Sequence, residues 1–209
     1  HHDREQHGRR GGGAVRPKLD MDFDLMGSMS VTPPEGETPE FPLTGAILDG
    51  PYRYRLWRIW DRALPMVCWV MLNPSTADAT EDDPTIRKIM KFSRGWGYGG
   101  VMVVNLFAYR ATDPSELITA AKSGVDVVGT FNEQHIMVAM HMCPKLTIAA
   151  WGAHGNVGGQ AARVLKLCRE ALGGERVLHS LKVNADGTPS HPLYLLDNST
   201  PNPYQGPSR

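Results

Sequence analysis

Four short apolar runs, separated by stretches with helical periodicity, constrain the fold of this chain more than any other feature. They cover residues 66–72, 101–106, 146–151 and 176–181. Short, continuously apolar segments are typical of strands buried on both faces of a parallel sheet. Helices are expected over residues 85–92, from 114 onward, over 131–142 and over 160–172. This alternation predicts an α/β fold, with three α/β/α layers around a central, mostly parallel four-stranded sheet.

Three other segments carry their own expectations. Residues 52–60 alternate apolar and basic side chains, which predicts a half-exposed strand at a sheet edge. Residues 1–44 have little apolar periodicity and predict a flexible leader, so residues 45–209 are expected to form one domain. Gly173 and Gly174 predict a left-handed cap at the end of the last helix.

The composition excludes several classes of protein. Hydrophobic residues make up 41% of the chain, enough for a sizeable core, and the formal net charge is zero. Acidic residues outnumber basic ones in the leader, so the remainder has a small positive charge that permits nucleic-acid binding without requiring it. Three cysteines without a CxxC pair argue against a disulfide framework, a metal site or an iron–sulfur cofactor. Without an apolar run of membrane-spanning length, we expect a cytoplasmic monomer.

Polar and glycine residues gather where the apolar runs end. The first run leads into Asn73-Pro74-Ser75, the second into Phe107, Tyr109 and Arg110, the third into Trp151-Gly152, and Ser190-His191 follows the fourth. In a parallel sheet these clusters meet at one edge, where open α/β folds bind ligands. An Asn-Pro step is equally typical of an ordinary turn, so the inference depends on this convergence.

The glycine-rich segment 151–159 leaves two interpretations open. Ahead of a helix, its backbone N–H groups could receive a phosphate. The same glycines could also form a flexible turn between a strand and a helix. There is no P-loop and no GxGxxG motif.

Several of these short motifs resemble the uracil-DNA glycosylase superfamily. Leu-Asn-Pro at 72–74 resembles the first motif of its mismatch-specific branch, and Val-Val-Asn-Leu at 103–106 is similar to its second strand. Ala-Trp-Gly at 150–152 resembles its third strand, and Ser-His-Pro-Leu at 190–193 its late His-Pro loop. More closely, the core resembles an uncharacterised bacterial and phage family through the motifs at 52–54, 72–78, 82–85, 105–107, 110–114, 151–152 and 191–194.

The resemblance implies cleavage of the N-glycosidic bond of a base rotated out of the DNA stack, without a metal or cofactor. Asn73 would position the attacking water, although an amide is no strong general base. A nearby carboxylate could assist, and Asp78, Asp82 and Asp83 are candidates. These acids could equally be solvated residues at a helix start, and Asp83-Pro84 is typical of a helix N-terminus.

Further roles follow from the same resemblance. Asn105 would hydrogen-bond the edge of the base, and His191 would stabilise developing negative charge or merely cap a turn. An aromatic platform is expected from Phe107, Tyr109, Trp96 or Tyr98. Arg87, Lys88, Lys91 and Arg94 form either a phosphate-binding or a solvated helix face. The expected substrate-binding set is Asn105, Pro74, Ser75, Phe107, Tyr109, Arg110, Trp151, Gly152 and Ser190.

Three functions remain open from the sequence. The first is a glycosylase that excises a modified pyrimidine, such as hydroxymethylated or glucosylated cytosine in phage DNA, with an antiviral role. The second is an enzyme that acts on free nucleosides or nucleotides. The third is a module that binds modified DNA without catalysis.

Overall fold

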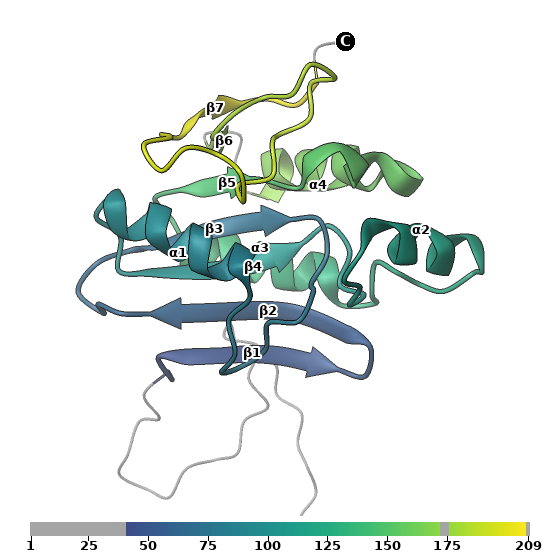
Figure 1. Cartoon of the computed structure of the whole chain (residues 1–209), viewed down its shortest axis with the longest axis horizontal. Helices are drawn as coiled ribbons and strands as arrows, with labels where there is room; N and C mark the ends of the chain where they lie inside the picture. The colour runs from purple at the N-terminus through teal and green to yellow at the C-terminus, as the bar shows by residue number, and fades with distance from the viewer. Residues whose placement is uncertain (1–40, 172–175, 208–209) are drawn as a thin grey trace, which may run out of the picture.

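A computed structural model describes residues 41–171 and 176–207, so the leader up to residue 40 and the expected Gly173-Gly174 cap lie outside the described residues. The described chain contains a seven-stranded mixed sheet in the order β1-β2-β4-β3-β5-β6-β7 (Figure 1). Its strands are β1 (Thr44–Asp49), β2 (Tyr52–Ile59), β3 (Met66–Met71), β4 (Gly100–Asn105), β5 (Thr147–Ala149), β6 (Leu178–Ser180) and β7 (Asn202–Tyr204).

The sheet confirms the α/β class but not the expected number of strands. β4, β3, β5 and β6 correspond to the four apolar runs, and neighbours among them pair in parallel. Antiparallel β1 and β2 extend the sheet at one edge, and antiparallel β7 extends it at the other. The expectation of a four-stranded sheet is therefore wrong. β7 has only three residues, too few for a periodic pattern, and β1 lies at the boundary of the expected leader.

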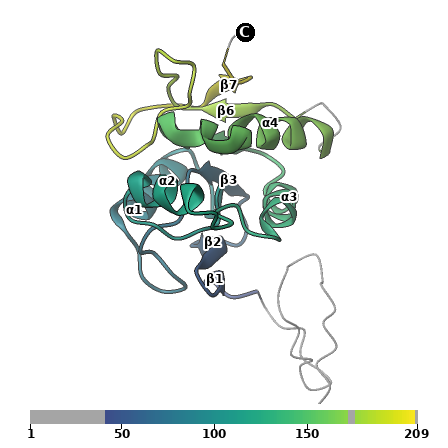
Figure 2. The ribbon, with the colours of Figure 1, turned by 90° about the vertical axis from the view of Figure 1, so that its right-hand side faces the viewer.

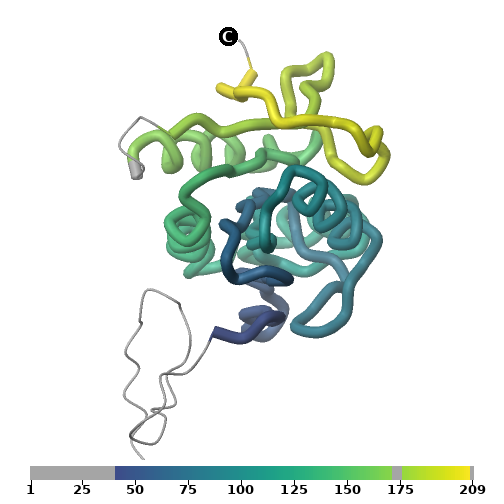
Figure 3. Tube along the Cα trace, turned by 90° about the vertical axis from the view of Figure 1, so that its left-hand side faces the viewer, coloured from purple at the N-terminus to yellow at the C-terminus, as the bar shows by residue number. Residues whose placement is uncertain are grey.

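Helices cover both faces of the sheet (Figures 2 and 3). They are α1 (Pro84–Gly95), α2 (Pro114–Lys122), α3 (Asn132–Met142) and α4 (Gln160–Ala171), the last preceded by the 3₁₀ segment Gly152–Gly159. Alternate residues of β3 separate the two cores. Val67 and Trp69 pack with α1, whereas Cys68 and Val70 pack with α3 and α4.

All three cysteines are buried and unpaired. Within the described residues, none of the helices combines the length and apolarity that a membrane crossing requires.

The expected helix starts are confirmed at two positions. Asp83 is the N-cap of α1, where its carboxylate accepts a hydrogen bond from the backbone N–H of Ile86, and Pro84 follows directly. Asp113 caps α2 in the same way and is followed by Pro114. Proline suits the first helical position because its missing N–H would have no partner there.

The prediction for residues 52–60 is wrong in one important respect. β2 lies inside the sheet between β1 and β4, and Arg53, Arg55 and Arg58 are buried rather than exposed. The β1–β2 pairing shifts register at this point, because Ile47 faces Arg55 and the next residue, Leu48, faces Arg53. This bulge interrupts the two-residue alternation of the strand. The alternation of basic residues in the sequence therefore does not correspond to a solvent-exposed face.

Candidate functional site

A cavity of about 590 Å³ opens at the carboxyl ends of β3 and β4. β3 continues through α1 on one face of the sheet, whereas neighbouring β5 continues through α4 on the other face. Ligands of open α/β sheets bind in the crevice that forms at such a switch in direction. The polar residues that line the cavity come from four separate segments of the chain: Arg53, Asn73, Ser75, Thr76, Asp83, Thr85, Asn105, Thr112, His191 and Tyr194.

Asn73 begins the loop that follows β3, and its amide is fixed by the backbone around it. Nδ2 donates to the carbonyl of Ala111 at 2.8 Å and to that of Pro74 at 3.1 Å. Both contacts use the donor side of the amide, so Oδ1 remains as the acceptor. The side chain is half-buried and lines the cavity. It can therefore accept a hydrogen bond from a water or a ligand, but its own donors are already occupied.

Asn105 ends β4 and lies opposite Met71 in the parallel pair. Its side chain lines the cavity and is 1% exposed, yet neither Nδ2 nor Oδ1 has a hydrogen-bond partner within the described residues. The backbone here is held firmly, because Asn132 donates to the carbonyl of Asn105 at 2.9 Å. Asn132 and Gln160 both donate to the next carbonyl, that of Leu106. Buried amides are normally satisfied, so this rigid, unpaired amide points to a ligand.

Of the three candidate carboxylates, only Asp83 lines the cavity. Its Oδ1 caps α1, so any catalytic role would use the other oxygen. Asp82 forms an ion pair with Arg58 at 2.8 Å. Asp78 accepts hydrogen bonds from the backbone N–H groups of Thr80 and Glu81. Asp82 and Asp78 therefore organise the loop before α1 and do not reach the cavity.

His191 reaches the cavity from the loop after β6. The backbone N–H of Leu193 donates to its Nδ1 at 3.2 Å, which leaves Nε2 as the donor of a neutral ring. Partial desolvation lowers the pKa of His191, and the nearby Asp83 carboxylate acts in the opposite direction. A neutral imidazole is therefore the form present at neutral pH. The N–H of Gly152 donates to the carbonyl of Pro189 at 2.8 Å, which attaches this loop to the segment after β5.

Sequence reasoning missed Arg53, although this residue lines the cavity and is 3% exposed. Its Nη1 donates to the carbonyl of Ala77 at 2.8 Å, so it contacts the loop that also carries Asn73. Arg58 contacts the same loop through Asp82 and the carbonyl of Asp78. The only available signal was an arginine within a strand rich in aromatic residues. The bulge that directs Arg53 to this side of the sheet leaves no mark in the sequence.

Other members of the expected substrate-binding set do not line the cavity. Phe107 and Trp151 are buried in the core on the α3 and α4 side. Tyr109 packs against Tyr52, with which it forms an isolated bridge. Pro74 is buried and contributes its carbonyl to Asn73. Ser190 is buried in a cluster that satisfies its own hydrogen bonds.

Two further members lie beside the cavity. Arg110 lines a neighbouring hollow of about 290 Å³ that shares Ser75 and Thr76 with the main cavity. Gly152 has a φ of 73° and lies next to His191, because a Cβ added to it would be 3.8 Å from that of the histidine. Both therefore border the site without lining the main cavity.

The cluster around Ser190 shows a complete set of internal partners. The Ser190 hydroxyl donates to Asn184 Oδ1 at 2.5 Å, and Asn184 Nδ2 donates to the Thr188 hydroxyl at 3.0 Å. The Thr188 hydroxyl in turn donates to Asp186 at 2.6 Å. We call these four residues the hairpin cluster. Its hydrogen bonds stabilise the turn before His191, so it has a structural role.

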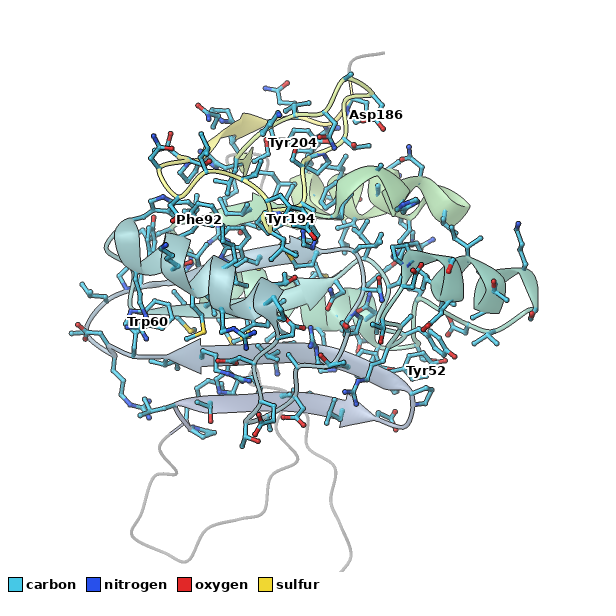
Figure 4. All side chains as sticks on the ribbon, in the orientation of Figure 1. Tyr52, Trp60, Phe92, Asp186, Tyr194 and Tyr204 are labelled. Carbon is cyan, nitrogen blue, oxygen red and sulfur yellow. The ribbon has the colours of Figure 1, made fainter. Side chains whose placement is uncertain are left out.

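The aromatic residue at the cavity is Tyr194, which was not among the expected platforms. Its side chain is 92% exposed, and Figure 4 shows it on the C-terminal loop in front of the sheet, near α1. Trp96 instead stacks on Trp69 and Phe92 in the core beside α1. Tyr98 packs against that same core. Tyr194 is thus an exposed aromatic side chain at the mouth of the cavity.

The basic side chains of α1 make contacts within the protein, and two of them bind the C-terminal loop. Lys88 and Lys91 both bind the carboxylate of Asp197, Lys88 at 2.7 Å. These two hydrogen bonds lower the pKa of Asp197 to about 2. Arg87 donates to the carbonyl of Asp82, and Arg94 lies 4.1 Å from the ring centre of Trp60. Each basic side chain of this face therefore has a partner in the protein.

The fold and the cavity define an α/β protein with a polar cavity at the carboxyl edge of its parallel strands. The family described as "Protein of unknown function (DUF1643)" matches residues 53–193, and the chain belongs to this family. The matched region includes the cavity residues from Arg53 to His191. No curated protein and no solved structure matches the chain.

Proposed function

We propose that the chain hydrolyses the N-glycosidic bond of a base that enters the cavity from DNA. The observation that carries this proposal is the pair of asparagines at the ends of adjacent parallel strands. Asn105 has an unpaired amide that fits the donor and acceptor edge of a base, and Asn73 retains one acceptor oxygen. Both line the same cavity, as the resemblance to the uracil-DNA glycosylase superfamily implies.

The reaction requires a water to add to C1′ of the sugar while the bond from C1′ to the base nitrogen breaks. The electron pair of that bond leaves with the base. Asn73 Oδ1 would accept a hydrogen bond from the water and orient it, which contributes through positioning rather than deprotonation. The proton that the water loses would pass to Asp83 or to solvent. Protonation of the departing base then completes the reaction and leaves an abasic site.

The other cavity residues fit supporting roles. Neutral His191 can donate from Nε2 to an exocyclic oxygen of the base, and a preorganised donor of this kind is commonly worth about 3 kcal/mol of transition-state stabilisation. Tyr194 can stack on the base at the mouth of the cavity. The cavity of about 590 Å³ falls within the range of roughly 300–1,000 Å³ for pockets that take drug-sized ligands. This size supports a pyrimidine with a bulky substituent, such as a glucosylated cytosine of phage DNA, and hence an antiviral role.

Duplex DNA that contains uracil, 5-hydroxymethylcytosine or glucosylated 5-hydroxymethylcytosine tests the proposal directly. Treatment with alkali cleaves the strand wherever an abasic site has formed. We expect cleavage of at least one modified duplex, and its loss with Asn73→Ala. Asn202→Ala, at the exposed first residue of β7, is the matched control and should retain full activity. The absence of abasic product from all duplexes would contradict the proposal, and tight binding without product would indicate a DNA-binding module.

An enzyme that acts on free nucleosides or nucleotides is the second candidate. It is favoured by the pairing of Lys88 and Lys91 with Asp197, because these lysines were the expected contacts to DNA phosphates. Incubation with free nucleosides and nucleotides, followed by chromatography for the released base, distinguishes the two. Release from nucleotides but not from duplex DNA would favour this second function.

A further inference from the structure

Arg53 is a buried cation on the wall of the cavity, and its hydrogen bonds are incomplete. Nη1 is bonded to the carbonyl of Ala77, whereas Nε has no partner among the described residues. No hydrogen bond from Nη2 and no ion pair to this guanidinium occur within residues 41–171 and 176–207. Burial lowers the pKa of Arg53 to about 10, and the Asp83 carboxylate acts in the opposite direction. The side chain is therefore charged at neutral pH.

Arg58, five residues along the same strand, provides a comparison, because its guanidinium has several partners in the protein. It is equally buried, yet it pairs with Asp82 and donates to the carbonyls of Asp78 and Glu81. A buried charge without such partners costs free energy, because water no longer solvates it. The difference between the two arginines indicates that the missing partner of Arg53 is a ligand group that carries or develops negative charge.

No other residue that lines the cavity carries a positive charge at neutral pH. The amides of Asn73 and Asn105 are neutral, and His191 is a neutral donor at neutral pH. Asp83 is itself an acid and would repel a departing anion. In the reaction given above, the electron pair of the broken bond moves onto the base. The base therefore becomes negative while it is inside the cavity. Among the residues that line this cavity, Arg53 is the only buried cation.

We propose that Arg53 is a catalytic residue that contacts the departing base and stabilises the negative charge that this base acquires as the bond to C1′ breaks. The inference rests on the proposed function, since it requires a base in the cavity. It also accounts for a weakness of the site, because Asn73 cannot strongly activate the water. Stabilisation of the departing base by Arg53 compensates for the weak activation of the water by Asn73.

Free bases test this role without requiring a known DNA substrate. The probes are uracil, which is neutral at pH 7, and 5-nitrouracil, whose ring N–H ionises readily to give a pyrimidine anion. Titration calorimetry would measure both with the wild-type protein, Arg53→Gln, Arg53→Lys and Arg94→Gln. Arg94 is an exposed arginine outside the cavity and serves as the control. Thermal unfolding would confirm that each variant is folded.

We expect the wild-type protein to bind 5-nitrouracil at least tenfold more tightly than uracil. Arg53→Gln should remove this preference while uracil still binds, Arg53→Lys should retain part of it, and Arg94→Gln should leave it unchanged. Equal binding of the two bases by the wild type, or a preference that survives in Arg53→Gln, would overturn the role of Arg53 and leave the proposed function intact. Failure of the wild type to bind either base would overturn the assignment of the cavity to a pyrimidine, and the inference with it.

Discussion

Two groups of polar side chains near the carboxyl edge of the sheet differ in whether their hydrogen-bonding atoms have partners in the protein. In the hairpin cluster, Asn184, Asp186, Thr188 and Ser190 bond to one another. At the cavity, Asn105 and Arg53 are more than nine-tenths buried, yet they keep polar atoms that have no partner among residues 41–171 and 176–207. Asn132 Oδ1 and Thr147 Oγ1 also lack a partner in the part of the chain that the structure describes, but neither residue lines this cavity. A ligand site is thus indicated by unpaired groups that share a cavity, and not by burial of polar residues alone.

The largest effect on stability should distinguish the two arginines of β2. Arg58→Met leaves Asp82 without its partner and releases the loop that precedes α1, so we expect a loss of about 3 kcal/mol in the free energy of unfolding. Arg53→Met removes a charge that forms no ion pair with any described residue, and it should change this free energy by less than about 1 kcal/mol. Urea unfolding of both variants measures the difference. Equal losses would mean that Arg53 is also a structural residue.

Asn105 should separate activity from stability. Asn105→Leu replaces an unpaired amide by an apolar group of similar shape, so the free energy of unfolding should stay unchanged or rise by about 1 kcal/mol. Base release should fall by roughly 100-fold or more, because the base would lose its hydrogen-bonding partner. Thermal unfolding and the abasic-site assay are the two measurements. A strongly destabilised Asn105→Leu would show that the amide has partners in the protein after all.

Ser190 should behave in the opposite way. Ser190→Ala leaves Asn184 Oδ1 without its donor, and we expect a loss of about 1–2 kcal/mol in stability. Activity per folded molecule should change little, since the hydroxyl does not line the cavity. Chemical unfolding and base release at saturating substrate would be compared with the wild type. A large loss of activity in a folded Ser190→Ala variant would show that Ser190 contributes to substrate binding.

The smallest effect concerns the ionisation of His191. Asp83 raises the pKa of this imidazole, while desolvation lowers it by more. Asp83→Asn removes the negative charge but preserves a good N-cap, so the pKa of His191 should fall further. The neutral ring would then persist to lower pH, and the acid limb of any pH–activity profile should move in the same direction. Nuclear magnetic resonance titration of the imidazole measures this shift, and an upward shift would contradict the described geometry.

Part of the site was predictable from the sequence because strand ends are fixed by local patterns. Asn73 directly follows one apolar run and Asn105 lies near the end of the next, and the rule that parallel strands end at one edge brought them together. Asp83 was predictable as the residue before a helix-starting proline. Arg53 was not predictable, since its side of the sheet depends on a register shift between β1 and β2. Tyr194 depends on a long loop, which Lys88 and Lys91 hold against α1 through Asp197.

The sequence by itself determined the α/β class, the four parallel strands and the starts of α1 and α2, because hydrophobic periodicity and capping are local properties. The tertiary structure decided the full width of the sheet, the burial of the arginines in β2 and the membership of the cavity. These features arise from pairing between distant segments, which no local pattern encodes. Residues such as Phe107 and Trp151 show the consequence, since both follow the right strands but face the core on the other side of the sheet.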